Sequence, residues 1–93
     1  MNYKPEQIPI PEPSLIWRVL DDGLVIVSPQ IGKVRVLNEV ATTIWQLISE
    51  NHSIAFIENH LVDNYAISSE KAAADLQQFL TELTDKGLLL WEN

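Results

Sequence analysis

The stretch GKVRVLNEVATTIWQLI, residues 32–48, decides the fold because it joins two kinds of periodicity without a linker. Its first part alternates polar and apolar residues, which predicts a β-strand over residues 33–37. Asn38 follows directly and is a good N-cap, since its side chain can accept a hydrogen bond from the first helical turn. Apolar residues then recur with helical spacing to about Glu50. We therefore expect a strand that leads straight into an amphipathic helix.

Two further strands precede this one in the sequence. Residues 14–20 (SLIWRVL) are rich in β-forming residues, and residues 24–28 (LVIVS) are almost continuously apolar. Between them lies Asp21-Asp22-Gly23, a turn signal in which Gly23 is expected to supply the positive φ of a tight hairpin. The sequence therefore predicts a three-stranded antiparallel β-meander.

The alternation of residues along these strands predicts which side chains face the core. In the third predicted strand, Val34 and Val36 are expected inward, and Lys33 and Arg35 outward. In the first, the same parity places Trp17 on the inner side.

Two more helices are expected after the first. Ser53 is expected to cap the second, and the third is expected over residues 69–86, with Gly87 as the glycine that follows it. The tail LLLW, residues 88–91, is apolar enough to pack back on the domain. Three strands followed by three helices make an α+β fold, similar to a winged helix-turn-helix with its sheet placed first.

The length and composition of the chain indicate one domain. Its 93 residues are too few for two independent cores, so we expect an extended Pro-rich segment over 1–13 and a single domain over 14–93. The absence of cysteine excludes disulfides and thiolate metal sites, and favours a cytoplasmic protein. No apolar run is long enough for a signal peptide or a membrane anchor, so no membrane partner is expected.

No pattern of residues points to catalysis. The sequence contains no nucleophile elbow, no glycine-rich phosphate loop and no HExxH motif. Its two histidines, His52 and His60, have only scattered carboxylates nearby, whereas zinc usually takes three or four protein ligands. We therefore expect no catalytic residue, no metal and no cofactor.

The charge argues against nucleic acid as a partner. The net charge is −7, and DNA binding requires Lys and Arg side chains at phosphates. In a helix-turn-helix the third predicted helix would read DNA, but over residues 69–86 it carries two lysines against four carboxylates. The scaffold resembles that of DNA-binding proteins, but its charge has the wrong sign for this use.

The outer edge of the strand at 33–37 remains as a candidate site. Because a helix follows this strand, no neighbouring segment has to pair with its outer side, and a peptide could add there as a further strand. Lys33, Arg35 and Lys71 would then attract an acidic peptide. Alternatively, Lys33 and Arg35 only discourage aggregation of an edge strand. The residue pattern does not separate these two interpretations.

The succession DDGLVIVSPQIGKVRVLNEVATTIWQLI, SIAFIENHLVDNY and DLQQFLTELTDKGLL resembles the family of the pyrroloquinoline quinone biosynthesis protein D, over about residues 14–90. That family defines the RiPP recognition element, a domain that recognises ribosomally made and post-translationally modified peptides. The most telling pieces are the Leu37-Asn38 junction with Ile44-Trp45 after it, and Asp75 through Leu83 followed by Gly87-Leu88-Leu89.

The resemblance implies a peptide chaperone that is not an enzyme. Such a domain binds the leader part of a precursor peptide as a strand added to the third strand and lying against the third helix. It then presents the peptide to a modifying enzyme, such as a radical SAM protein, or to a leader peptidase. Carried over by position, and with the charged Lys71 included, the expected peptide-binding residues are Lys33, Val34, Arg35, Val36, Leu37, Lys71, Ala72, Asp75, Leu76 and Phe79.

Two other functions stay open at this point. The same scaffold could serve as a protein–protein adaptor without a leader peptide, or as a DNA mimic or transcription-related module. The resemblance does not select among pyrroloquinoline quinone, lasso-peptide and other peptide pathways. A homodimer also stays open, because a second copy of the chain can pair with an open edge strand.

Overall fold

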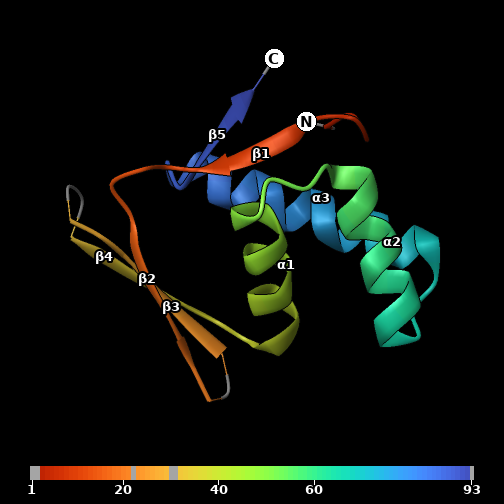
Figure 1. Ribbon diagram of the computed structural model, residues 1–93, viewed down its shortest axis with the longest axis horizontal. Coiled ribbons are helices and arrows are strands. Elements are labelled where there is room, and N and C mark those ends of the chain that lie inside the picture. The colour runs from red at the N-terminus through yellow and green to blue at the C-terminus, as the bar shows by residue number, and fades with distance from the viewer. Residues whose placement is uncertain (1–2, 22, 30–31, 93) are drawn as a thin grey trace.

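The protein is described by a computed structural model covering residues 3–21, 23–29 and 32–92, without the side chains of residues 33–35 and 92. Along the described part of the chain, four strands come first, three helices follow, and a last strand ends the fold, as Figure 1 shows. In order they are β1 (Ile8–Pro11), β2 (Ile16–Leu20), β3 (Gly23–Ser28), β4 (Lys33–Leu37), α1 (Glu39–Ser49), α2 (Ile54–Tyr65), α3 (Ser69–Asp85) and β5 (Leu89–Glu92). The predicted α+β fold is confirmed.

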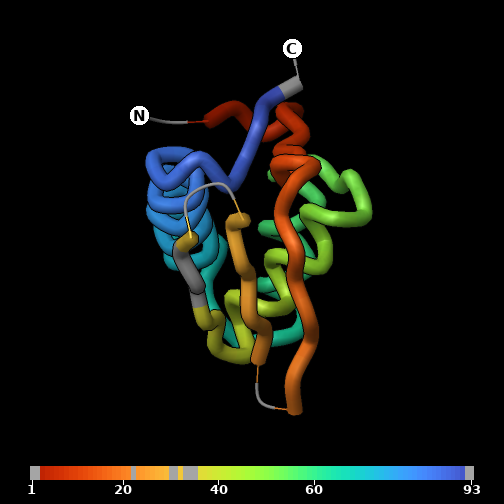
Figure 2. The backbone as a smooth tube through the Cα atoms, turned by 90° about the vertical axis from the view of Figure 1, so that its left-hand side faces the viewer, coloured from red at the N-terminus to blue at the C-terminus, as the bar shows by residue number. Residues whose placement is uncertain are grey.

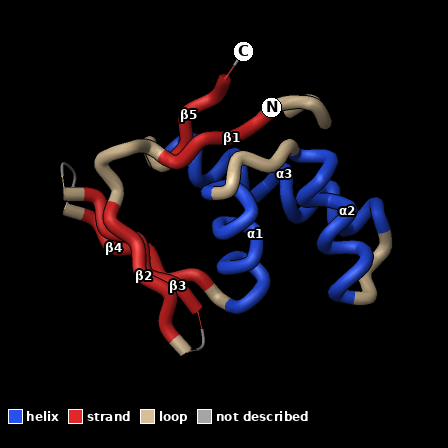
Figure 3. Tube along the Cα trace, in the orientation of Figure 1, coloured by secondary structure: helices blue, strands red, loops and turns tan. Residues whose placement is uncertain are grey.

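The three predicted strands form one antiparallel sheet with the order β2-β3-β4. Its central strand, β3, alternates buried and half-buried residues, and Leu24 and Ile26 are buried against α1. All three helices lie on this inner side of the sheet, as the strands and helices of Figure 3 show. The sheet therefore has one covered face and one open face.

The three helices begin where the sequence predicts. Each is capped by a side-chain oxygen that accepts a hydrogen bond from a backbone N–H three residues later: Asn38 from Ala41, Ser53 from Phe56, and Ser68 from Lys71. α3 ends as predicted, since Gly87 has a φ of 76° and the N–H of Leu88 bonds to the carbonyl of Leu83. None of the described helices combines the length and apolar character that crossing a bilayer requires.

A second sheet, which the sequence did not predict, joins the two ends of the described chain. β1 pairs with β5 in antiparallel fashion, with Pro9 opposite Trp91 and Ile10 opposite Leu90. The apolar tail thus packs on the domain as expected, but as a strand paired with the Pro-rich segment. Pro9 is fully buried. β1 therefore contributes to the core.

The N-terminal segment is also hydrogen-bonded to two helices. The carbonyls of Pro5 and Gln7 accept hydrogen bonds from the N–H groups of Ala55 and Ile54, which begin α2. On α3, the Gln77 side chain accepts a bond from the Tyr3 N–H at 2.8 Å and donates one to the Tyr3 carbonyl at 3.0 Å. The Gln77 amide thus pairs with both backbone groups of Tyr3, as a residue of a neighbouring β-strand would, and fixes the N-terminal segment to α3.

The predicted inward position of Val36 in β4 is wrong. Val36 is 71% exposed, whereas Leu37 is 3% exposed. The register explains this: Leu37 lies opposite the buried Leu24, and Val36 lies opposite Val25 on the outer face. The prediction failed because both faces of the sheet carry apolar residues, so alternation alone could not fix the parity. The predicted orientations of Lys33, Val34 and Arg35 fall on side chains outside the described residues.

Two other sequence-based expectations concern residues near the sheet. Trp17 does lie on the inner side, where its ring meets that of Trp45 edge to face at a centroid distance of 6.4 Å. It remains 37% exposed because β2 is an edge strand. Gly23, expected at a positive φ, does not have one: among the described glycines only Gly32 and Gly87 do.

Candidate functional site

β4 is an edge strand of the main sheet, with its outer side unpaired in the described part of the chain. In Figure 2, which looks onto the outer face of the sheet, β4 is the edge on the side of α3 and β2 is the opposite edge. Along such an edge, alternate residues direct their backbone N–H and carbonyl groups outward. β4 can therefore accept one more strand between the sheet and α3.

The end of β4 is held in place by the start of α1. The Thr42 hydroxyl donates to the Leu37 carbonyl at 3.4 Å, and the Asn38 side chain caps the helix that follows immediately. Leu37 itself is buried in the core. The open edge is thus fixed relative to the helices.

α3 has two flanks on either side of its buried stripe. One flank carries Gln77 and Thr84, which are bonded to Tyr3 and to the Trp91 indole N–H. Helical spacing places Asp75 and Phe79 on the opposite flank. Asp75 is exposed, and Phe79 is half-buried and packs against the core. This second flank is the one left for a ligand.

The structure separates the predicted site residues into accessible and inaccessible ones. Ala72 and Leu76 are 0% exposed in the core, so their side chains support α3 and present no surface to a ligand. Leu37 is buried as well and offers only its backbone to a ligand. A part of these three residues in peptide binding stays a prediction, through the backbone for Leu37 and through support of α3 for Ala72 and Leu76.

The predicted cluster of basic residues is only partly described. Lys71 is exposed and pairs with Asp75 at 3.2 Å, across one turn of α3. An exposed ion pair of this kind contributes on the order of 0.3–0.5 kcal/mol to stability. Because this contribution is small, Lys71 or Asp75 can leave the pair and bind a group of a ligand instead. The side chains of Lys33 and Arg35 lie outside the described residues.

The histidines do not form a metal site in the structure. His52 stacks on Phe56 with ring centroids 3.9 Å apart and lies 3.3 Å from a Glu50 carboxylate oxygen. Among the described residues, no group of three or more His, Cys, Asp or Glu side chains is placed to hold a metal ion.

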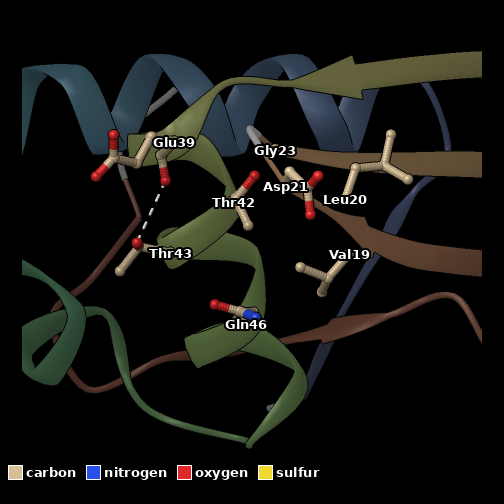
Figure 4. Close-up of a pocket in the computed structure, with 8 residues that line it drawn as sticks. All are labelled: Val19, Leu20, Asp21, Gly23, Glu39, Thr42, Thr43 and Gln46. Carbon is tan, nitrogen blue, oxygen red and sulfur yellow. Dashed lines mark hydrogen bonds between the residues drawn. The ribbon is translucent and has the colours of Figure 1, made fainter.

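A hollow of about 440 Å³ lies between the β2–β3 connection and α1. Figure 4 shows Val19 and Leu20 on one wall and Thr42, Thr43 and Gln46 on the other. Both hydroxyls already have partners: Thr42 bonds to a backbone carbonyl, and Thr43 bonds to the Glu39 carbonyl and the Tyr65 hydroxyl. The charged residues among the described ones in its wall are Asp21 and Glu39, both acidic, so the charge of this hollow disfavours an anionic ligand.

Comparison with known proteins gives the same family as the resemblance in the sequence. Residues 23–89 match the family described as "Coenzyme PQQ synthesis protein D (PqqD)". No curated protein matches the chain at a significant level. β1 and β2 lie before the matched residues.

Two solved structures are similar to this chain. One is "TbiB1 in Complex with the TbiA(beta) Leader Peptide", with 26% identity, a TM-score of 0.83, and coverage of 86% of this chain and 93% of that one. The other is "Lasso peptide synthetase B1 complexed with the leader peptide", with 26% identity, a TM-score of 0.82, and coverage of 88% and 96%. In each case the likeness extends over nearly the whole of the other chain.

Proposed function

This chain belongs to the PqqD family, and we propose that it captures the leader segment of a ribosomally made precursor peptide by adding it as a strand to β4. The open edge of β4 beside α3 is the observation that carries this proposal. Both similar solved structures are complexes with leader peptides, which supports it. The sheet would then have the order β2-β3-β4-peptide.

The backbone of residues 33–37 supplies the hydrogen bonds to the peptide, and side chains supply selectivity. On α3, the half-buried ring of Phe79 offers an apolar contact, and the exposed pair of Lys71 and Asp75 offers either charge to a polar group of the peptide. Ala72 and Leu76 act indirectly, by holding the helix against the core.

The protein acts as a chaperone with no catalytic step of its own. It presents the bound peptide to a second protein, either a modifying enzyme such as a radical SAM protein or a leader peptidase. The absence of cysteine is consistent with action in the reducing cytoplasm. The pathway could produce pyrroloquinoline quinone, a lasso peptide or another modified peptide.

Proline substitutions in β4 test the proposal. Arg35 and Val36 are adjacent, so one directs its N–H toward β3 and the other toward the open edge. Proline at the position facing β3 breaks the sheet and lowers Tm, whereas proline at the open edge removes only a donor to the peptide. Circular dichroism and thermal unfolding identify the variant that stays folded, and Val36→Thr is the control that keeps the N–H group.

The binding measurement is fluorescence anisotropy of a labelled leader peptide taken from the nearest short reading frame. We expect saturable binding at micromolar concentration or tighter by the wild type and by Val36→Thr. The folded proline variant should bind at least tenfold more weakly. If that variant bound the leader with wild-type affinity, the peptide would have to bind elsewhere than at β4, which would contradict the proposal.

A further inference from the structure

The main sheet carries most of the large apolar side chains that the structure exposes. Of the eight described, five lie on β2 and β4, with exposed fractions from 37% to 71%: Ile16, Leu20 and Val36 on the outer face, and Trp17 and Val19 on the inner side at the β2 edge. Every residue of β2 is exposed. Isolated apolar residues on a surface are ordinary, but a contiguous group marks a contact surface.

The outer face of the sheet is apolar across all three strands. Ile16 lies opposite Val27, and Val25 lies between Arg18 on one side and Val36 on the other. An antiparallel sheet with one solvated face usually turns mainly polar residues outward, whereas here Arg18 is surrounded by apolar residues. No helix is drawn in front of this face in Figure 2, and a hollow of about 330 Å³ lies on it, bordered by Ile16, Leu20 and Val27.

Arg18 is the single charged residue that borders this hollow. Within the described part of the chain its guanidinium forms no ion pair, since the described pairs involve only His52 and Lys71. An unpaired guanidinium surrounded by aliphatic side chains fits a partner that brings an apolar surface and one carboxylate. The partner chemistry is therefore apolar with an acidic group.

A second copy of the chain fits this face poorly. Each copy carries a net charge of −7, so two copies repel each other. Arg18 is the middle residue of β2, so full antiparallel pairing of two β2 edges would place it opposite the same residue of the second copy.

The outer face is continuous with the proposed peptide site. Val36 belongs both to β4, the strand that would pair with the peptide, and to the outer face. In a sheet extended by one strand, alternate peptide side chains project from this same face. A protein docked there would contact the domain and the peptide together, which enlarges the interface beyond what the domain offers alone.

We infer that the outer face of the β2-β3-β4 sheet docks the enzyme that acts on the bound peptide, through an apolar surface bearing a carboxylate that pairs with Arg18. This inference rests on the proposed capture of a leader peptide. It identifies the surface by which the domain brings peptide and enzyme together.

The test measures two affinities on the full chain. The first is for the peptide-modifying enzyme or peptidase encoded beside the precursor, by biolayer interferometry with and without leader peptide. The second is for the labelled leader, by anisotropy. Ile16→Glu and Leu20→Glu place a charge on the outer face at residues that are 62% and 48% exposed, so we expect both variants to fold. Phe56→Glu, at 46% exposed on α2, is the matched control.

We expect both outer-face variants to bind the enzyme at least tenfold more weakly, with leader affinity within twofold of wild type. Phe56→Glu should change neither affinity, and Arg18→Glu should weaken enzyme binding alone. The inference is overturned if the outer-face variants keep wild-type enzyme affinity, or if Phe56→Glu weakens it equally. It is also overturned if the wild type binds leader but not enzyme, or if sedimentation shows a dimer that Leu20→Glu dissociates.

The same pair of measurements separates this inference from the proposed function. Suppose that the wild type binds the enzyme but not the leader, and that only the outer-face variants lose the binding of the enzyme. Leader capture is then wrong, and the docking face is supported. Suppose instead that the wild type binds the leader and that the outer-face variants bind the enzyme as tightly as the wild type does. The docking face is then wrong, and leader capture is supported.

Discussion

Gly23 and the carbonyl of Leu37 approach so closely that a Cβ built on Gly23 would lie 2.1 Å from the Leu37 oxygen. The same oxygen accepts the hydrogen bond from Thr42 in α1. Gly23 begins β3, and Leu37 ends β4 one residue before the cap of α1. The glycine is therefore required by the space at this junction and not by a positive φ.

Gly23→Ala should destabilise the protein by about 2–3 kcal/mol, because the clash involves backbone atoms that no side-chain rotation can relieve. Gly32→Ala is the control: its Cβ would meet nothing within 4 Å, and the cost comes only from its φ of 75°. That cost should be about 1–2 kcal/mol. Urea unfolding gives both values, and a smaller loss at Gly23 than at Gly32 would contradict the steric explanation.

The link between Tyr3 and α3 should contribute measurably to stability. Gln77→Ala removes two hydrogen bonds to the Tyr3 backbone and should cost about 1–2 kcal/mol. Tyr3→Ala removes the stack on Trp91, where the ring centroids are 4.3 Å apart, and should cost about 1 kcal/mol. Because both changes free the same segment, the double variant should lose less than the sum. Strict additivity in urea unfolding would show that the two contacts are independent.

Ala66 ends α2 in the left-handed region, with φ of 51° and ψ of 40°. An L-residue with a side chain is strained there, whereas glycine is not. Ala66→Gly should therefore raise the free energy of unfolding by about 0.5–1 kcal/mol. Ala73→Gly, inside α3, is the control and should lower it by about 1 kcal/mol. A loss of stability in both variants would argue that the αL geometry carries no strain.

The parts of the fold that local signals specify were predictable from the sequence. Asn38, Ser53 and Ser68 each act within three residues of their own position, and all three caps are in place. The pairing of β1 with β5 was not predictable, because the partners lie some 80 residues apart and each strand has only four residues. A proline-rich segment gives no periodicity from which such a pairing could be inferred.

In the candidate site, too, features set by neighbouring residues could be predicted from the sequence, whereas features set by packing between distant elements could not. The strand that leads into α1 could be located by its alternation and cap, so its edge was correctly identified. Ala72 and Leu76 were assigned to the wall of the site by their position in α3 alone, and a position in the sequence does not show how much of a side chain the neighbouring elements cover. The apolar outer face was missed for a related reason: Val36 and Leu37 are adjacent and both apolar, and only the register with β3 decides which one is buried.

The two flanks of α3 allow a final test of where the peptide lies. Phe79→Ala should weaken binding of the labelled leader about tenfold or more, because it removes the half-buried ring from the flank of α3 proposed to face the peptide. Gln77→Ala lies on the opposite flank and should leave leader affinity unchanged, although it also destabilises the fold through Tyr3. Anisotropy titrations are made well below the Tm of both variants, so that loss of folded protein does not mimic loss of binding. If the two substitutions weaken leader binding equally, the loss reflects reduced stability of the fold and does not show which flank of α3 the peptide contacts. If Gln77→Ala alone weakens it, the peptide lies against the N-terminal segment.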